Sequence, residues 1–239
     1  MKPNGKSAVV TGGTTGLGLA VAKALVNDGC QVMYAAREPA GSPLPGAHFH
    51  PLDVRDPDSV HTLMAAAADR FGGIDILVAN AGTSRPGPVR ELSHEDWTTV
   101  IDTNLTGTFS CVSAALPRLE KSPQGRIITL SSALAVRPAP GASSYAASKA
   151  ALEMFTRVLA LEVAAQGITA NCVSPGFIDA GMGRRLSANA AVWPAYEAKL
   201  ATPRLGTGDE VAAAVRYLIS PDASYVNGHV LEVNGGLRW

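Results

Sequence analysis

Residues 7–29 have the sequence SAVVTGGTTGLGLAVAKALVNDG, which gives the first indication of the fold. Residues 7–11 form a short apolar run that ends in glycines, which is typical of a buried strand. In residues 17–28 the apolar side chains recur at helical spacing, and the pattern stops at Gly29. The stretch therefore predicts a buried strand, a tight glycine turn and a helix.

The same alternation continues along the chain. Further apolar runs predict strands at 31–36, 49–52, 74–79, 126–130, 168–173 and 230–233. Helical spacing predicts helices at 57–71, 95–119, 144–165 and 209–218. Residues 38–46 hold three prolines and are expected to be a loop. The alternation indicates an α/β fold, with one doubly wound domain over residues 1–239 and helices on both faces of a parallel sheet.

The composition excludes several classes of protein. The 239 residues are 46% hydrophobic and 17% charged, which excludes a disordered chain. Twenty Lys+Arg balance twenty Asp+Glu, so no global field attracts nucleic acid or an anionic membrane, and neither is expected as a partner. His48 and His50 have no third ligand at useful spacing, so we expect no metal site.

The cysteines and the apolar runs bear on the compartment. Cys30, Cys111 and Cys172 lie among apolar or small neighbours, and none is in a C-x-x-C pair. This indicates buried, reduced thiols in a cytoplasmic protein. The N-terminal residues hold no apolar stretch long enough for a signal peptide, and no run approaches the length of a membrane span.

The glycine turn Thr11-Gly12-Gly13-Thr14-Thr15-Gly16-Leu17-Gly18 lies between the first strand and the first helix. Glycines let the backbone approach a pyrophosphate closely, and the helix N-terminus supplies free N–H groups and a favourable dipole. The turn therefore predicts a nucleotide site, although a merely tight connection would use the same residues.

A tyrosine and a lysine lie four residues apart on a predicted helix, at Tyr145 and Lys149. A free phenol has a pKa of ~10, and lowering it to about 7 requires roughly 4 kcal/mol in favour of the phenolate. A cation ~4 Å away supplies about that much at an effective dielectric constant near 20. The pair could thus perform general acid–base chemistry, although a surface pair of this spacing is common on helices.

The motifs taken together resemble the short-chain dehydrogenase/reductase family over nearly the whole chain. The resemblance rests on the following motifs, in order: Thr11-Gly12-x-x-x-Gly16-x-Gly18, Asp53-Val54, Asn80-Ala81-Gly82, Asn104, Ser132, Tyr145-x-x-x-Lys149 and Pro175-Gly176. It implies a Rossmann-type sheet of about seven parallel strands, a nicotinamide cofactor, and hydride transfer between that cofactor and a ketone or secondary alcohol.

The resemblance also implies a role for each matching residue. Tyr145 is expected to exchange a proton with the substrate oxygen, while Lys149 lowers the tyrosine pKa and binds the nicotinamide ribose. Ser132 is expected to orient the carbonyl, rather than Ser131, whose side chain would point to the other face of the strand. Asn104 is expected to hold a water in the proton relay.

The remaining expected contacts are with the cofactor. Asp53 is expected to bind the adenine amino group, and residues 80–82 to line the adenosine ribose. The expected catalytic residues are Asn104, Ser132, Tyr145 and Lys149. The expected cofactor-binding residues are Gly12, Thr14, Thr15, Gly16, Leu17, Gly18, Ala36, Arg37, Asp53, Val54, Asn80, Ala81, Gly82, Tyr145, Lys149, Pro175, Gly176 and Ile178.

The end of the second predicted strand bears on which nicotinamide cofactor is used. Enzymes of this kind that use NAD usually have an acid there, and this chain has Ala36 followed by Arg37. An arginine can grip a 2′-phosphate, so NADP(H) is favoured over NAD(H). Relatives often hold the nicotinamide carboxamide with a threonine at the position of Ala180, which lacks the hydroxyl.

The segment 177–205 matches the place where relatives have a substrate lid. Its aromatic residues Phe177, Trp193 and Tyr196 are expected to contact a partly hydrophobic carbonyl compound, with residues 134–140 as another wall. Whether Arg184 and Arg185 hold an anionic group of the substrate or are simply solvated stays open.

Three functions remain open. The leading reading is an NADPH-dependent reductase of a 3-oxoacyl or polyketide-like ketone. The alternatives are an NAD-dependent alcohol or diol dehydrogenase and, against the intact Ser132, Tyr145 and Lys149, a non-catalytic NADP-sensing protein. By resemblance the partners are a small carbonyl or alcohol substrate and further copies of the chain in a homotetramer or dimer, joined through the helices at 95–119 and 144–165.

Overall fold

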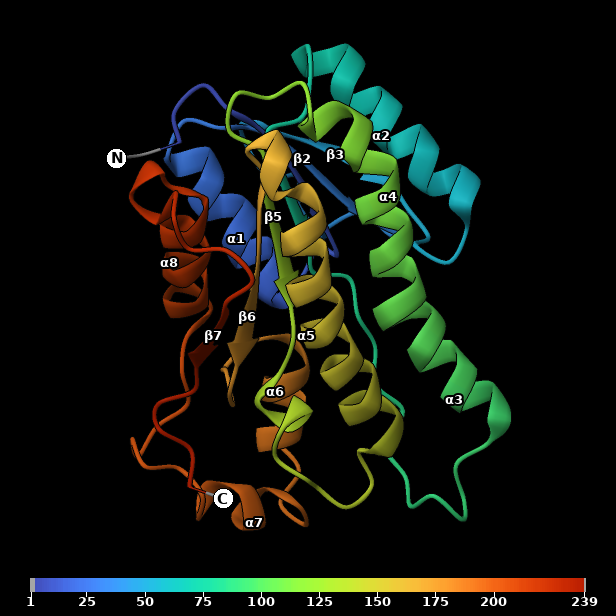
Figure 1. Cartoon of the computed structure of the whole chain (residues 1–239). Helices are drawn as coiled ribbons and strands as arrows, with labels where there is room; N and C mark the ends of the chain where they lie inside the picture. The colour runs from blue at the N-terminus through green and yellow to red at the C-terminus, as the bar shows by residue number, and fades with distance from the viewer. Residues whose placement is uncertain (1–2, 239) are drawn as a thin grey trace.

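The structure, a computed structural model, describes residues 3–238, so residues 1, 2 and 239 of the expected domain lie outside the described part (Figure 1). Seven parallel strands form one sheet in the order β3-β2-β1-β4-β5-β6-β7. The strands are β1 (Ser7–Thr11), β2 (Gln31–Ala36), β3 (Ala47–Pro51), β4 (Ile76–Ala79), β5 (Arg126–Leu130), β6 (Thr169–Pro175) and β7 (Val230–Val233). The expected doubly wound, Rossmann-type sheet is confirmed.

Helices cover both faces of this sheet (Figure 1). They are α1 (Gly16–Asn27), α2 (Pro57–Phe71), α3 (His94–Ile101), α4 (Gly107–Leu119), α5 (Ser143–Val163), α6 (Gly181–Ser187), α7 (Trp193–Glu197) and α8 (Gly208–Ile219). The alternation of strand side chains divides the core in two. Val9 packs toward α2, α4 and α5, while its neighbours Ala8 and Val10 pack toward α1 and α8.

The strand order creates the position of the site. From β1 the chain winds outward through β2 to β3, and then returns to the other side of β1 to form β4. Neighbouring crossovers therefore lie on opposite faces at β1 and β4, and a crevice opens beyond the carboxyl ends of these two strands. Figure 1 shows α6 and α7 at that end of the sheet.

The helix expected at 95–119 differs from the prediction. It comprises α3, a π-helical segment from Asp102 to Thr106, and α4, in which the Gly107 N–H donates to the Asp102 carbonyl. The prediction of one uninterrupted α-helix was therefore wrong. The π turn holds one extra residue, but the apolar residues within each flanking helix keep helical spacing, so the sequence pattern did not reveal the interruption. Such π segments occur frequently at functional sites, and this one contains Asn104.

Other differences are at element ends or in short elements. The Pro-rich segment 38–46 lies between β2 and β3 without helix or strand until Ala47, as expected. The lid forms two short helices, α6 and α7, which its sequence did not predict. Short 3₁₀ turns follow β5 (Ala133–Ala135), α5 (Ala164–Gln166) and α8 (Pro221–Ala223).

The described residues also bear on membrane and metal. None of the helices in residues 3–238 has the length and apolar character needed to span a membrane. Within the same residues no group of three or more His, Cys, Asp or Glu could hold a metal ion. The three cysteines are buried and form no disulfide.

Candidate active site

A cleft of about 520 Å³ opens at the carboxyl ends of the central strands. Residues expected to bind the cofactor or react line it, from each of the segments that follow β1, β2, β3, β4, β5 and β6. They are Gly12, Thr14, Thr15, Gly16, Leu17, Ala36, Arg37, Asp53, Val54, Asn80, Ala81, Gly82, Ser132, Tyr145, Pro175, Gly176 and Ile178. The expected residues Gly18, Asn104 and Lys149 do not line the cleft, and each supports it from behind.

The glycine turn is held closed by the segment that follows β4. The Asn80 side-chain amide donates to the carbonyls of Thr11 (3.0 Å) and Gly12 (3.1 Å). A Cβ on Gly12, whose φ is +65°, would lie 2.8 Å from Asn80 Nδ2, and one on Gly18 would lie 2.1 Å from the Gly12 carbonyl oxygen. Gly18 therefore allows α1 to pack against the turn, and only glycine fits at both positions.

The turn fits the pyrophosphate of a dinucleotide. Thr15 precedes α1 in an extended conformation, and its side chain makes no capping hydrogen bond to the first turn of that helix. The N–H groups at the start of α1 thus remain available beside a glycine backbone. The volume of the cleft lies within the range of roughly 300–1,000 Å³ that is usual for cofactor and ligand sites.

The adenosine end of the cleft holds charges of both signs. The Arg55 guanidinium makes a bidentate contact with the Asp53 carboxylate, at 3.0 Å from Nε to Oδ1 and 2.6 Å from Nη2 to Oδ2. This hydrogen bonding holds the pKa of Asp53 below its ordinary value. Asp53 therefore lines the cleft as expected, but with an arginine already on its carboxylate. Arg37 lines the cleft beside Glu38, and no ion pair joins the two in the described structure.

Ser132 and Tyr145 meet on the wall of the cleft. Ser132 follows β5 in an extended conformation, and its hydroxyl acts on the Tyr145 phenol to lower the pKa of that group. Ser131 turns its hydroxyl the other way, toward the Glu153 carboxylate (2.9 Å) and the Lys149 carbonyl (3.2 Å). Strand alternation therefore presents one serine to the cleft-side tyrosine and the other to the buried side of α5.

The lysine lies behind the tyrosine rather than beside its hydroxyl. Lys149 Nζ donates to the Leu130 carbonyl at 2.6 Å and lies 5.7 Å from the centroid of the Tyr145 ring. Burial lowers the pKa of Lys149 to about 8. Burial also raises the pKa of Tyr145, an effect that the neighbouring Ser132 hydroxyl offsets only in part.

The expected lowering of the tyrosine pKa was therefore wrong for the protein by itself. The expectation counted the attraction of a nearby ammonium ion and left out the loss of water. In the structure, desolvation disfavours the ionised form of both groups, the phenolate of Tyr145 and the ammonium ion of Lys149. Tyr145 consequently stays protonated at neutral pH.

Asn104 is a fully buried brace. Its Oδ1 accepts from the Thr83 N–H at 2.8 Å, and its Nδ2 donates to the Thr83 carbonyl and the Ser148 hydroxyl, each at 3.0 Å. Both amide protons are thus used within the protein. The side chain ties the segment after β4 to α5, one residue before Lys149.

The two arginines left open by the sequence differ in position. Arg184 is exposed and paired with Asp179, at 2.7 Å from Nε to Oδ1, while Arg185 lines the cleft. The sequence analysis did not assign further lining residues to the site, although most of them lie shortly after a strand end, and that position was the available signal. These are Glu38, Pro39, Leu52, Arg55, Thr83, Arg85, Thr99, Thr103, Ser131, Ala180, Gly181, Met182 and Gly183.

The aromatic residues of the lid do not line the cleft, which corrects the expectation that they contact substrate. Phe177 is buried, and its ring centroid lies 5.7 Å from that of Trp193 and 5.1 Å from that of Tyr196. With Leu186, Leu200, Leu205, Ala133 and Leu237 these rings form a small hydrophobic cluster of their own. Burying each other's faces removes more apolar surface from water than lining an open cleft would.

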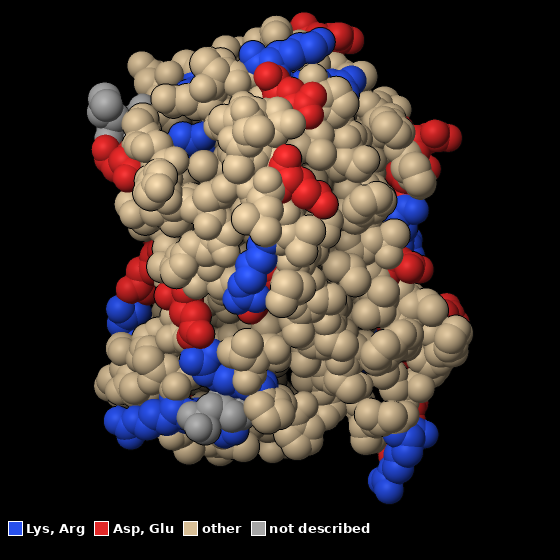
Figure 2. Space-filling view, in the orientation of Figure 1, with Lys and Arg blue, Asp and Glu red and all other residues tan. Residues whose placement is uncertain are grey.

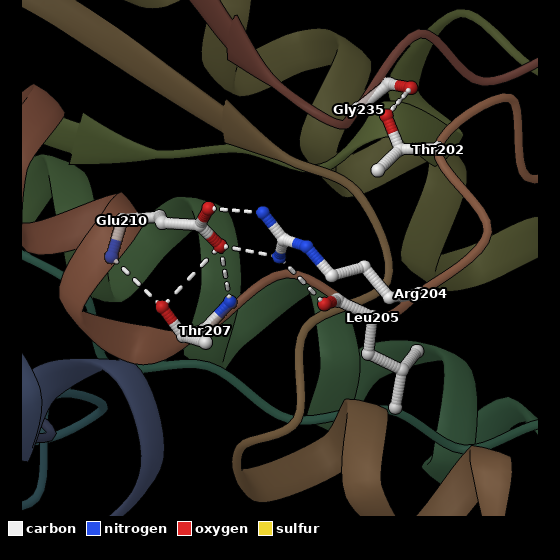
Figure 3. A network of polar contacts seen from close by, with 6 residues as sticks. All are labelled: Thr202, Arg204, Leu205, Thr207, Glu210 and Gly235. Atoms are coloured by element: carbon white, nitrogen blue, oxygen red, sulfur yellow. Dashed lines mark hydrogen bonds and ion pairs between the residues drawn. The ribbon is translucent and has the colours of Figure 1, made fainter.

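The two ends of the lid are joined at its base. The Gly206 N–H donates to the Phe177 carbonyl at 2.9 Å, and the Asp179 N–H donates to the Gly206 carbonyl at 2.8 Å. Figure 3 shows the C-terminal stem, where Arg204 binds the Glu210 carboxylate and that carboxylate accepts from the Thr207 N–H at the start of α8. In the same view, the Thr202 hydroxyl donates to the Gly235 carbonyl at 2.9 Å.

Comparison with known proteins agrees with this geometry. A family model described as enoyl-(acyl carrier protein) reductase matches residues 12–238. The chain is 38% identical to the 3-oxoacyl-(acyl-carrier-protein) reductases of Vibrio cholerae and Escherichia coli, and each alignment covers 99% of both chains.

Solved structures match over the same length. The aldohexose dehydrogenase of Thermoplasma acidophilum has a TM-score of 0.91 and 30% identity, covering 98% of this chain and 94% of that one. A short-chain dehydrogenase from Burkholderia cenocepacia, solved in complex with NADP, has a TM-score of 0.90 and 34% identity and covers 99% of both chains. The chain therefore belongs to the short-chain dehydrogenase/reductase family and is an NAD(P)-dependent oxidoreductase that acts on CH–OH or C=O groups.

Proposed function

We propose that the chain reduces a 3-oxoacyl or polyketide-like ketone with NADPH. The observation that carries this proposal is that Ser132 and Tyr145 line the same wall of the cleft, with Lys149 buried behind them. A phenol and a hydroxyl that face one cavity form a site for a carbonyl oxygen. The similarity to 3-oxoacyl-(acyl-carrier-protein) reductases supports the substrate class.

The protonation state of Tyr145 favours the reductive direction. Burial raises its pKa, so the phenol carries its proton at neutral pH. Reduction of a ketone needs a proton donor at the oxygen, whereas oxidation of an alcohol needs a phenolate as base. Reduction should therefore run at neutral pH, and oxidation should gain with rising pH.

The cleft residues would hold a nicotinamide cofactor, which would supply the hydride for the carbonyl carbon. Ser132 donates a hydrogen bond to the carbonyl oxygen and orients it. Tyr145 transfers its phenolic proton to that oxygen as the C=O bond becomes CH–OH, which leaves a phenolate. The Lys149 ammonium stabilises this phenolate from behind, since at a pKa of about 8 it still carries its charge at pH 7. Asn104 holds the segment after β4 in place against α5.

NADPH is preferred because Arg37 lines the adenosine end and Ala36 leaves no carboxylate at the strand end. The measurement is kcat/KM with NADPH and with NADH. An Arg37→Ala variant should lose most of the preference for NADPH while keeping its activity with NADH. Equal values for the two cofactors in the unaltered enzyme would contradict the assignment.

A second function is oxidation of an alcohol or sugar with NAD. Glu38 also lines the adenosine end, where a carboxylate can bind ribose hydroxyls. The likeness to an aldohexose dehydrogenase favours the same reading. A screen of NADPH oxidation over 3-oxoacyl thioesters, cyclic ketones and diketones, set against NAD reduction with sugars and diols, separates the two functions.

The mechanism is tested by Tyr145→Phe, which removes only the hydroxyl. The variant should bind NADPH as before and lose about 10²- to 10⁴-fold in kcat, the range expected for a general acid. Turnover that persists at the original rate would refute the role of the phenol. An unaltered enzyme that binds NADPH and turns over none of these substrates would favour a sensing protein instead.

We also propose that the chain forms a homo-oligomer, a tetramer or a dimer, through α4 and α5. These helices expose large apolar side chains, with Leu161 82%, Met154 57% and Phe109 55% exposed. Figure 2 shows a broad uncharged area over α5. Mass measurement in solution tests this, and Leu161→Asp should reduce the assembly size.

Three buried free thiols support the reducing cytoplasm as the compartment.

A further inference from the structure

The cleft carries an excess of positive charge although the chain as a whole is neutral. Four arginines line it: Arg37, Arg55, Arg85 and Arg185. Two of them are already paired, Arg55 with Asp53 at 2.6 Å and Arg85 with Asp96 at 3.4 Å. Among residues 3–238 the other two, Arg37 and Arg185, have no ion pair or hydrogen-bond partner through their guanidinium groups. Two unpaired cations in one cleft suit a ligand with two separate anionic groups.

The position of Arg185 indicates which of the two anionic groups it can reach. The lid helix α6 begins on the glycine turn, since a Cβ on Gly16 would lie 3.2 Å from the Cα of Gly181. Arg185 comes one helical turn after Gly181 and so projects from the same face of α6. Long side chains on a helix lean toward its N-terminus, and here that direction leads to the glycine turn. Arg184, the next residue, lies on another face and is paired with Asp179.

The lid otherwise offers the cofactor little side-chain contact. Ala180, which precedes the first residue of α6, has no side-chain hydrogen-bond donor. The neighbouring residues that line the cleft from the lid are Ile178, Gly181, Met182 and Gly183, and none carries a charge. Arg185 is thus the cation through which the lid can reach an anion bound at the glycine turn.

We propose that Arg185 binds the pyrophosphate of the nicotinamide dinucleotide from the lid side, opposite the glycine turn. The inference rests on the proposed use of a nicotinamide cofactor and adds a residue to its site. Arg37 then serves the 2′-phosphate and Arg185 the pyrophosphate, which both NADPH and NADH possess. The N–H groups of the turn and the guanidinium clamp the same anion from two sides.

The lid packs as one unit, so a contact between Arg185 and the pyrophosphate would act on all of it. Its aromatic cluster and its joined base, Phe177 and Asp179 with Gly206, make it one packed unit, and Arg204 with Glu210 fixes its C-terminal stem (Figure 3). A charge contact at Arg185 therefore holds the whole unit against the glycine turn.

The test is direct binding without substrate, measured by titrating NADPH and NADH into the unaltered protein and its variants. Arg185→Ala should weaken both cofactors by about tenfold, which corresponds to ~1.4 kcal/mol, and should leave the ratio of the two affinities unchanged. Arg185→Lys should recover part of the loss. Arg37→Ala should change the ratio, and Arg184→Ala, the matched control on the same helix, should change neither affinity.

Other outcomes overturn the proposal. Arg185→Ala with both affinities within twofold of the unaltered protein would show that the residue does not bind the cofactor. A loss confined to NADPH would assign Arg185 to the 2′-phosphate, and a rise in KM for the ketone with unchanged cofactor affinity would assign it to an anionic group of the substrate. If the unaltered protein binds neither cofactor, the proposed function fails, which is a separate result from the failure of Arg185.

Discussion

Replacing Lys149 with Met tests how strongly burial acts on the candidate site. Burial lowers the pKa of Lys149 from 10.5 to about 8. At about 1.4 kcal/mol per pKa unit, this corresponds to roughly 3 kcal/mol by which the native state disfavours the charged amine. Between these two pKa values the unfolded state binds more protons than the native state. The free energy of unfolding contributed by this group therefore rises with pH, from a full penalty below about pH 8 to none above 10.5.

The assay is urea unfolding of the unaltered protein and of Lys149→Met between pH 7 and pH 10.5. The difference in unfolding free energy, unaltered minus variant, should rise by about 3 kcal/mol over that range. The variant also leaves the Leu130 carbonyl without the amine, a loss of about 1–3 kcal/mol. That loss is the same at every pH, so it shifts the difference in unfolding free energy by a constant amount and does not change how the difference varies with pH.

Catalysis separates the two contributions of the lysine. We expect Lys149→Met to be inactive at every pH. Its stability at neutral pH should stay close to that of the unaltered protein, because the removed charge penalty and the lost hydrogen bond are similar in size. Lys23→Met, which deletes an exposed ammonium ion from α1, is the matched control for loss of a charge. If the difference in unfolding free energy between the unaltered protein and Lys149→Met is constant from pH 7 to pH 10.5, the argument that burial lowers the pKa of this lysine is refuted.

Two further substitutions test the turn and the lid stem. Gly18→Ala places a Cβ 2.1 Å from the Gly12 carbonyl oxygen, so NADPH affinity should fall by more than tenfold in a titration, while Gly41→Ala, with open space around it, should bind normally. Glu210→Gln removes the carboxylate that Arg204 binds. This hydrogen bond lowers the pKa of Glu210 from 4.5 to about 2, so its stabilisation is present above pH 4.5 and is lost as the pH falls toward 2. The Tm of Glu210→Gln should lie below that of the unaltered protein at pH 7 and approach it near pH 2, and equal Tm values at pH 7 would contradict a role for this pair.

Local signals in the sequence were enough to predict most of the fold. A strand that is buried on both faces has a continuous apolar run in its sequence, and a helix that covers the sheet has apolar residues at a period of 3.6. Both patterns can be recognised in a short stretch such as residues 7–29. The Pro-rich loop at 38–46 was predictable for the same reason. The π turn around Asn104 was not, because one added residue leaves the apolar spacing of the flanking helices nearly unchanged.

Side-chain partners were harder to predict than elements. Phe177, Trp193 and Tyr196 are close in sequence, which suggested a shared surface for substrate, yet they pack on one another. Arg184 and Arg185 have the same chemistry and adjacent positions, and the phase of α6 alone directs one to Asp179 and the other to the cleft. Such partners come from distant parts of the chain or from the rotation of a helix about its axis.

The order of strands and helices, the glycine turn and the i, i+4 spacing of Tyr145 and Lys149 could all be recognised in the sequence. These are properties of short segments, and steric and hydrophobic patterning act within a few residues. The pKa values at the site and the position of the lid depend on the tertiary structure. Burial raises the tyrosine pKa and lowers that of the lysine, because the penalty on a charge depends on how much water the whole fold excludes.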